Sequence, residues 1–203
     1  MPLRRTYDAA RGGVVSSIFD AYLDRASKWS DIQEFMPFLY EQAAARPGCR
    51  VLELGARRGN STIAFLAGTA ESGGRVWSCD LMDVRGLPGG IGMWAQSPSW
   101  RLTVGDDMNP GVLAELPAEM DVLFIDTSHE YEHTLAECRA YVPRVKAGGV
   151  ALFHDTNVYA WPEYQWTGEV PPVQQALNEY CAEAGLEWEN LPGQYGMGVI
   201  HVR

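Results

Sequence analysis

Two aspartates and two histidines follow two of the apolar runs in this sequence. Asp126 comes directly after the run at 121–125 and is followed by His129, while His154 and Asp155 come directly after the run at 149–153. An imidazole, whose ordinary pKa is about 6.5, can take a proton from a hydroxyl near neutral pH. Two carboxylates that converge repel each other unless a cation relieves the repulsion, and oxygen ligands suit Mg²⁺. We therefore expect catalytic roles for Asp126, His129 and His154.

The histidines leave two interpretations of this site open. Histidine is a poor ligand for Mg²⁺ and favours Mn²⁺, Zn²⁺ or Fe²⁺. His154 therefore either belongs to a site for such a cation, or acts as a base or hydrogen-bond donor in a site without metal. His129 is favoured as the proton acceptor over a helix-capping or surface role, because it starts the segment after a strand end. His133 and His201 are expected to be structural or surface residues.

A glycine-containing turn is predicted between a strand and a helix at residues 53–61, which read Glu53-x-Gly55-x-x-x-Gly59-x-Ser61. Glycines in such a turn let the backbone bend sharply and approach a ligand closely. The spacing differs from the G-x-G-x-x-G of a pyrophosphate-binding loop. A nucleotide-binding oxidoreductase is therefore a distant alternative for this chain.

Acidic residues also follow the next two apolar runs. Asp80 ends the run at 75–80, where a carboxylate can accept hydrogen bonds from both hydroxyls of a ribose. Asp106 and Asp107 follow the run at 100–104, where one of the two can accept from the exocyclic amine of an adenine. The alternatives are a solvated strand end for Asp80 and a helix N-cap for Asp107.

Strands and helices alternate through the middle of the sequence. Strands are expected at 50–54, 75–80, 100–104, 121–126 and 149–153, and helices at 60–70, 110–116 and 131–145. This alternation is typical of a parallel sheet covered by helices on both faces. Two helices, at about 14–27 and from 30 to about 45, precede it. A helix at about 173–184 and a hairpin at 187–190 and 196–202 follow it.

Ligands of such sheets bind beyond the carboxyl ends of the strands, where the strand order reverses. All five expected strands deliver acidic groups to this one rim. A single terminal aspartate is an ordinary cap or turn residue. Five in register favour one shared ligand site.

Length and composition restrict the class of protein. A chain of 203 residues fits one domain. Its net charge of −10 disfavours DNA or RNA as partner. No apolar run approaches the ~20 residues of a membrane span, and no secretion signal is expected, so we predict a cytoplasmic protein without membrane contact. Four widely spaced cysteines without a C-x-x-C pair indicate free thiols and no zinc cluster of cysteines.

The order of the motifs resembles that of the class I S-adenosylmethionine-dependent methyltransferases. The resemblance covers residues 45–158 and rests on the turn at 53–61, Asp80 and three further segments. These are Phe124-Ile125-Asp126-x-x-His129-x-Tyr131, Lys146-x-Gly148-Gly149 and Phe153-His154-Asp155. The chain is most similar to a small branch that includes macrocin-type sugar O-methyltransferases and cephalosporin-hydroxylase-like proteins.

This resemblance implies a Rossmann-like, doubly wound α/β fold with a mostly parallel seven-stranded sheet and an antiparallel terminal hairpin. We expect a single methyltransferase domain over residues 1–203. Its parts are an N-terminal helical cap (1–46), a cofactor-binding core (47–158), a lid loop (159–172), and a terminal helix with the hairpin (173–203).

The resemblance also implies roles for individual residues. The expected cofactor is S-adenosylmethionine, bound by Glu53, Gly55, Gly59, Ser61, Asp80, Leu81, Asp106, Asp107 and Asp126. Glu53 or Ser61 would hold the amino and carboxylate groups of its methionine part, and Leu81 with Met82 would enclose the adenine. Relatives hold Mg²⁺ at the positions of Asp126, His154 and Asp155. A histidine at the position of His129 is the proposed base of similar sugar O-methyltransferases.

The acceptor is expected to be a small molecule: a sugar, a phenol or another natural product. The aromatic segment at 159–168, together with Trp94, suggests a lid over a flat or sugar-like substrate or, alternatively, the interface of a homo-oligomer. We expect O-methylation with assistance from a divalent metal. The alternatives are a metal-independent N- or O-methyltransferase and a non-catalytic protein that binds S-adenosylmethionine.

Overall fold

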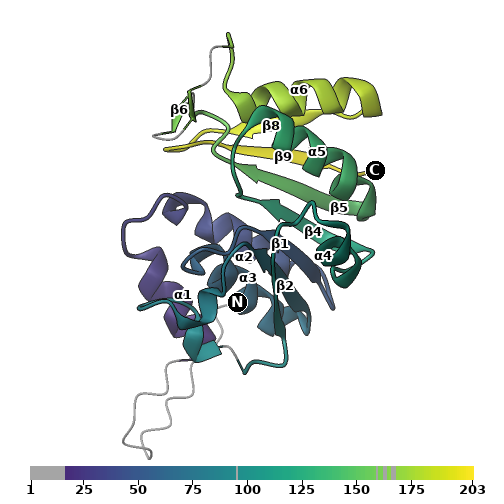
Figure 1. Ribbon diagram of the computed structural model, residues 1–203. Coiled ribbons are helices and arrows are strands. Elements are labelled where there is room, and N and C mark those ends of the chain that lie inside the picture. The colour runs from purple at the N-terminus through teal and green to yellow at the C-terminus, as the bar shows by residue number, and fades with distance from the viewer. Residues whose placement is uncertain (1–16, 95, 159, 162–163, 166–167) are drawn as a thin grey trace, which may run out of the picture.

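The computed structural model describes residues 17–94, 96–158, 160–161, 164–165 and 168–203 (Figure 1). Its helices are α1 (Ile18–Ala26), α2 (Met36–Ala44), α3 (Asn60–Ser72), α4 (Pro110–Glu115), α5 (Tyr131–Tyr141) and α6 (Pro172–Ala184). The strands of the main sheet are β1 (Arg50–Leu54), β2 (Arg75–Asp80), β3 (Trp100–Val104), β4 (Met120–Ile125), β5 (Val145–His154), β8 (Trp188–Leu191) and β9 (Met197–His201). Short 3₁₀ turns lie at Gln33–Phe35, Val84–Gly86, Gly92–Trp94 and Val142–Arg144.

The seven strands of the main sheet follow the order β3-β2-β1-β4-β5-β9-β8. Strands β1 to β5 pair in parallel, whereas β9 runs antiparallel to both β5 and β8. The prediction of a mostly parallel seven-stranded sheet with an antiparallel terminal hairpin is confirmed. The strand order reverses at β1, which lies between β2 and β4. A ligand site is therefore expected beyond the carboxyl ends of β1 and β4.

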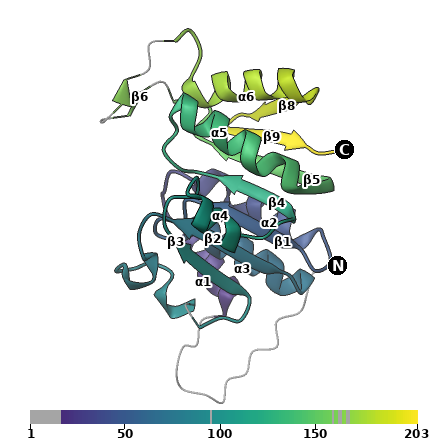
Figure 2. The same cartoon turned by 45° about the vertical axis from the view of Figure 1, so that its right-hand side comes forward.

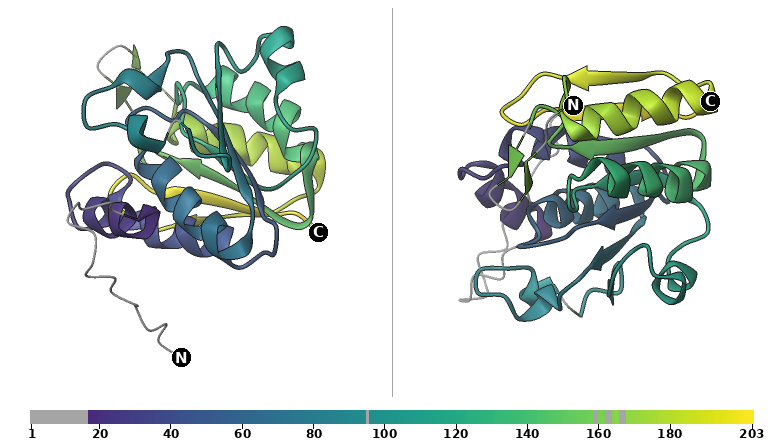
Figure 3. Two further views of the ribbon diagram at one scale, coloured as in Figure 1. Left: turned by 90° about the horizontal axis from the view of Figure 1, so that it is seen from below. Right: turned by 45° about the horizontal axis from the view of Figure 1, so that its top comes forward.

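Helices cover both faces of this sheet (Figure 2). Successive side chains of a strand point to opposite faces, so Val51 packs into one core and Leu52 and Leu54 into the other. The first core is completed by α1, α2 and α3, and the second by α5 and α6. Figure 3 shows the two groups of helices on opposite sides of the strands. All four cysteines are free, as predicted, and all four are buried.

Three expected boundaries were wrong. The α-helix expected over 131–145 ends at Tyr141, because Pro143 has no amide hydrogen to continue its hydrogen bonds, and a 3₁₀ turn follows over Val142–Arg144. Strand β5 consequently begins at Val145 and reaches full register with β4 only after an irregularity between Met120 and Val122. The second N-terminal helix begins at Met36 rather than at residue 30, with Pro37 in its first turn.

The segment expected to form a lid is described only in part, because residues 159, 162–163 and 166–167 lie outside the described residues. Within it, β6 (Ala160–Trp161) and β7 (Tyr164–Gln165) pair antiparallel as a separate two-stranded sheet. The first part of the expected helix at 14–27 also lies outside the described residues. No helix in the described ranges is long and apolar enough to cross a membrane.

Candidate functional site

The turn after β1 requires glycine at its first position. Gly55 has a φ of +85°, and a Cβ atom added to it would lie 1.9 Å from the carbonyl oxygen of Asp126. The backbone of β1 therefore passes directly against the end of β4, which only a residue without a side chain permits. Gly59 also has positive φ, at +78°, and caps the N-terminus of α3.

Asp80 ties this turn to the end of β2. One carboxylate oxygen, Oδ2, accepts hydrogen bonds from the amides of Ala56 (3.0 Å) and Arg57 (2.8 Å). The other, Oδ1, accepts from the amide of Met82 at 3.0 Å. A carboxylate offers about four acceptor positions, so capacity for a ligand hydroxyl remains after these three bonds. Asp80 therefore shapes the turn and still presents an acceptor beyond the strand ends.

A pocket of about 450 Å³ lies beyond the carboxyl ends of β1 to β4. Its volume is in the range of small-molecule sites. The lining includes six of the predicted cofactor residues: Gly55, Asp80, Leu81, Asp106, Asp107 and Asp126. Leu81 and Met82, also in the lining, are 74% and 61% exposed, which is unusual for large apolar side chains and suits a flat apolar ligand group between them.

A second pocket of about 330 Å³ lies on the other side of the glycine turn. Ser61 lines it, together with the segment from Trp29 to Ile32 and Asn60 in α3. Arg57 and Asp126 line both pockets, so the two meet at these residues. The Arg57 guanidinium pairs with Asp31 from the segment after α1. The N-terminal helical region thereby forms one wall of the site.

Glu53 lies beneath the turn and lines neither of these two pockets. Its carboxylate is fully buried and accepts hydrogen bonds from the hydroxyls of Thr62 (2.7 Å) and Ser78. Burial raises its pKa to about 7, although the nearby hydroxyls of Ser61, Ser78 and Thr62 act in the opposite direction. The structure thus places this predicted cofactor residue inside the fold, where its side chain reaches from β1 to β2 and α3.

The four residues expected to act chemically come together. His154 Nδ1 lies 3.0 Å from Asp155 Oδ2 and 3.4 Å from Asp126 Oδ1. His129 Nε2 lies 3.4 Å from Asp155 Oδ2 and 3.7 Å from Asp126 Oδ1. His129 and Asp155 both have a φ close to +60°, which is uncommon for residues with a side chain. The chain therefore adopts unfavourable backbone conformations at the two places that aim these groups at each other.

The groups of this cluster shift one another's pKa values. Burial alone would lower the pKa of His154, but Asp126 and Asp155 outweigh it and raise the pKa to about 10. Burial also acts on Asp126, but the His154 charge prevails and lowers the pKa of that carboxyl. Burial raises the pKa of Asp155. Positive charge beside Asp126, chiefly the imidazolium of His154, therefore offsets the burial of these carboxyl groups.

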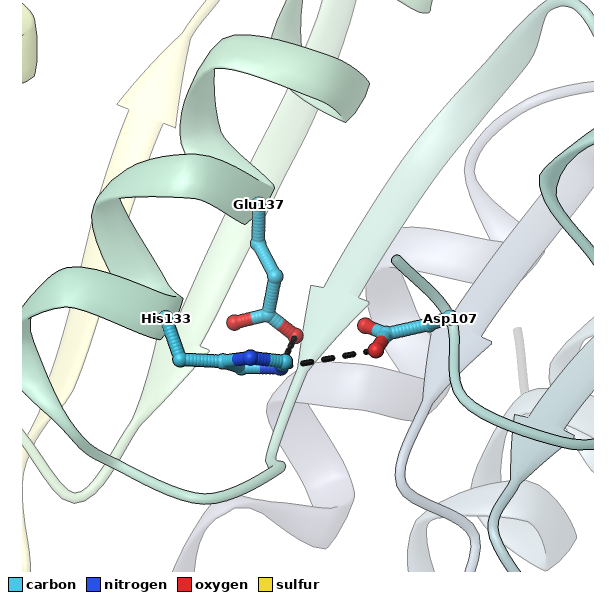
Figure 4. Close-up of side chains that lie close together, drawn as sticks. All are labelled: Asp107, His133 and Glu137. Atoms are coloured by element: carbon cyan, nitrogen blue, oxygen red, sulfur yellow. Dashed lines mark ion pairs between the residues drawn. The ribbon is translucent and has the colours of Figure 1, made fainter. Parts of the chain in front are cut away.

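A second cluster, not predicted from the sequence, joins Asp107 to two residues of α5, His133 and Glu137 (Figure 4). His133 and Asp107 line the larger pocket, whereas Glu137 is completely buried. Hydrogen bonding of the imidazolium to Asp107 and Glu137, together with the attraction of their charges, raises the pKa of His133 to about 10, and burial raises the pKa of Glu137 to about 8. The one signal in the sequence is the i, i+4 spacing of His133 and Glu137, which places both on one face of a helix.

Residues 52–156, just over half of the chain, match a family described as a methyltransferase domain. The chain belongs to this family. The match runs from β1 to the end of β5 and so contains the larger pocket and both side-chain clusters. The predicted family is confirmed.

Relatives of this methyltransferase domain agree with that assignment. Demethylmacrocin O-methyltransferase of Streptomyces fradiae is 36% identical over 64 residues, which cover 30% of this chain and 16% of the relative. Among solved structures, an O-methyltransferase from Bacillus cereus in complex with SAH has a TM-score of 0.66 at 18% identity, covering 94% of this chain and 93% of the other. The MycE methyltransferase of the mycinamycin biosynthetic pathway, in complex with Mg, SAH and mycinamycin VI, has a TM-score of 0.65 at 18% identity, with coverage of 94% and 54%.

These structural similarities establish the fold of the methyltransferase domain. The matches to three curated relatives span only 29%, 16% and 8% of the relatives' own lengths. The sequence similarity is therefore confined to part of each of these proteins.

Proposed function

We propose that this chain transfers a methyl group from S-adenosylmethionine to a hydroxyl group of a small molecule. The observation that carries the proposal is the larger pocket, which gathers acidic and apolar groups at the point where the strand order of a methyltransferase sheet reverses. The solved structures with the same fold include complexes with SAH, and one of them also contains Mg and mycinamycin VI.

The residues of the larger pocket fit the adenosine part of the cofactor. Asp80 has acceptor capacity left for the ribose hydroxyls, and the exposed Leu81 and Met82 offer apolar surface to the adenine. Asp106 is exposed at the end of β3, which suits contact with the exocyclic amine. Asp107 faces His133 instead.

The second pocket fits the methionine part and the approach of the acceptor. Ser61 and Asn60 offer polar groups near the N-terminus of α3, where an anionic group is favoured. Arg57 and Asp126 stand where the two pockets meet, so the sulfonium, which supplies an electrophilic methyl group, belongs near them. Trp29, with an exposure of 75%, offers a flat apolar surface to an acceptor.

Methyl transfer to a hydroxyl requires an acceptor held in line with the sulfonium and a group that takes its proton. His129 lines neither pocket, but its Nε2 lies 3.7 Å from Oδ1 of Asp126, which lines both, and we propose it as the proton acceptor. Asp126, His154 and Asp155 offer three donor atoms within 4.8 Å of one another, and these donors fit a divalent cation of the Mn²⁺ or Zn²⁺ type. Such a cation would polarise the acceptor hydroxyl.

A metal-independent transfer is the second candidate. The observation that favours it is the raised pKa of His154, which keeps an imidazolium between Asp126 and Asp155 at neutral pH. In that case the imidazolium supplies the positive charge that holds both carboxylates in place, and His129 acts without a cation.

Calorimetric titration with S-adenosylhomocysteine tests the cofactor assignment. We expect Asp80→Asn to weaken binding at least tenfold, about 1.4 kcal/mol. The control is Asp83→Asn, an exposed carboxylate three residues further on that pairs with Arg85 and does not line the larger pocket. If the wild-type protein does not bind the ligand, or if both variants bind as the wild type does, the proposal is wrong.

Turnover with a panel of hydroxylated acceptors separates the two candidates. Activity that is lost in EDTA and restored by a divalent cation supports metal assistance. Activity that EDTA leaves unchanged supports the metal-independent reaction. Cofactor binding without turnover on any acceptor would support a non-catalytic binding protein instead.

A further inference from the structure

The cluster of Asp107, His133 and Glu137 brings together side chains from two separate parts of the fold. Asp107 lies in the loop after β3, while His133 and Glu137 lie one turn apart on α5, and all three point toward one another (Figure 4). Asp107 is 7% exposed and Glu137 is completely buried. Two carboxylates in such surroundings are costly unless positive charge compensates them.

The distances around His133 are long and nearly equal. Its Nε2 atom lies 3.4 Å from Asp107 Oδ1 and 3.5 Å from Glu137 Oε1. A protonated nitrogen donates its one hydrogen in one direction, and charge-assisted bonds of this kind measure about 2.7–2.9 Å. A single N–H therefore cannot satisfy both carboxylates well. Ligand atoms placed 2.0–2.1 Å from a tetrahedral ion lie about 3.3 Å apart, close to both observed separations.

Two oxygens of the cluster have no hydrogen-bond partner among the described residues. They are Asp107 Oδ2 and Glu137 Oε2, both buried. Two residues outside the cluster, Thr127 and Tyr141, donate hydrogen bonds to its members. The hydroxyl of Thr127 donates to Glu137 Oε1 at 2.8 Å, and the hydroxyl of Tyr141 donates to the backbone carbonyl of Asp107. Hydrogen bonds to ligating carboxylates are typical of the surroundings of metal sites.

We propose that Asp107, His133 and Glu137 form a second cation site, separate from the cluster of Asp126, His154 and Asp155 and selective for Zn²⁺ over Mg²⁺. One imidazole and two carboxylates suit a borderline cation better than Mg²⁺, which prefers oxygen ligands at octahedral spacing. Three protein ligands leave one position for water or a ligand atom. Since Asp107 and His133 line the larger pocket, the site is reached from there.

Such an ion would connect the loop after β3 to α5 and so stabilise one wall of the larger pocket. The inference rests on the geometry of these three residues and does not depend on the proposed methyl transfer. It is tested by metal binding, which needs no acceptor and no turnover.

The experiment titrates the chelator-stripped, full-length protein with Zn²⁺ by calorimetry and with Co²⁺ by visible absorption. All variants carry His154→Gln, which removes the imidazole of the first cluster. In this background we expect one equivalent of Zn²⁺ to bind, and Co²⁺ to give the intense visible bands of tetrahedral coordination. Adding Glu137→Gln should weaken Zn²⁺ binding at least tenfold and abolish those bands. Adding Glu132→Gln, the same change at an exposed position of α5, should leave both unchanged.

Other outcomes overturn the proposal. If Zn²⁺ does not bind in the His154→Gln background, or binds equally with and without Glu137→Gln, the cluster holds protons rather than a cation. Should Glu137→Gln fail to fold, by far-UV circular dichroism, His133→Gln serves in its place, since it removes the nitrogen ligand and keeps both carboxylates. Equal Zn²⁺ affinity in that variant likewise refutes the site.

Discussion

Replacing Glu53 by glutamine should increase the free energy of unfolding relative to that of the wild type as the pH rises. Glu53 is fully buried in β1, where Oε2 accepts two hydroxyl hydrogen bonds and Oε1 has no partner among the described residues. Burial raises its pKa from 4.5 to about 7. The folded protein therefore holds a proton on this group over a pH range in which the unfolded chain has lost it.

The sign of the effect follows from this difference in bound protons. A group whose pKa is raised in the folded state stabilises the fold fully below its unfolded pKa, and this contribution is lost as pH rises through the folded value. For Glu53 the window runs from about pH 4.5 to about pH 7. The shift amounts to about 3 kcal/mol in total, of which about 2.5 kcal/mol is lost between pH 5 and pH 8. Glutamine keeps the carbonyl acceptor for Thr62 and Ser78 but does not ionise.

The assay is urea-induced unfolding of the ligand-free wild type and Glu53→Gln at pH 5 and pH 8. The free energy of unfolding of the variant, relative to the wild type, should increase by about 2 to 3 kcal/mol between the two pH values. Glu187→Gln, at an exposed position, is the control and should show no such change. A difference between wild type and Glu53→Gln that stays constant with pH would refute the reasoning, and one that decreases would show that Glu53 is stabilising as an anion.

Three further changes test the site. Gly55→Ala should lower Tm by at least about 5 °C more than Gly48→Ala does. Both glycines have positive φ, but only at Gly55 would the added Cβ meet backbone atoms. Equal decreases in Tm would contradict this reasoning. His129→Gln should reduce turnover on hydroxyl acceptors at least about 100-fold while leaving the calorimetric affinity for S-adenosylhomocysteine within about twofold, and unchanged turnover would exclude it as the proton acceptor. Trp29→Ala should raise the KM for the acceptor severalfold without changing the KM for S-adenosylmethionine, because the exposed ring of Trp29 lines the second pocket. An increase in the KM for S-adenosylmethionine alone would mean that the acceptor binds elsewhere.

The sequence by itself determined the class of fold and most of the rim of the site. Short apolar runs, each ended by acidic residues and separated by helical stretches, allow few arrangements other than a parallel sheet with helices on both faces. Because parallel strands end at the same edge, Asp80, Asp106 and Asp126 had to lie near one another, and all three line the larger pocket. Local signals sufficed here because each depends on neighbours in the chain.

The helix ends were less predictable, although the reason was visible in the sequence. Pro143 marks the end of α5 more accurately than the apolar pattern, which continues into β5. Hydrophobic periodicity reports which side of an element is buried, and both a helix end and the start of a buried strand are apolar.

Only the tertiary structure decided where individual polar groups point. Glu53 shares a face of β1 with Val51, so it is carried into the core, where hydroxyls from β2 and α3 surround it. His133 and Tyr141 of α5 meet Asp107 in the loop after β3, although β2 and β1 lie between β3 and β4 in the sheet. Such contacts depend on strand order and helix placement, which are set by packing of the whole domain. The neighbours of a residue in the chain do not determine such contacts. The spacing of His133 and Glu137 places them on one face of a helix, but that Asp107 joins them was decided by the fold.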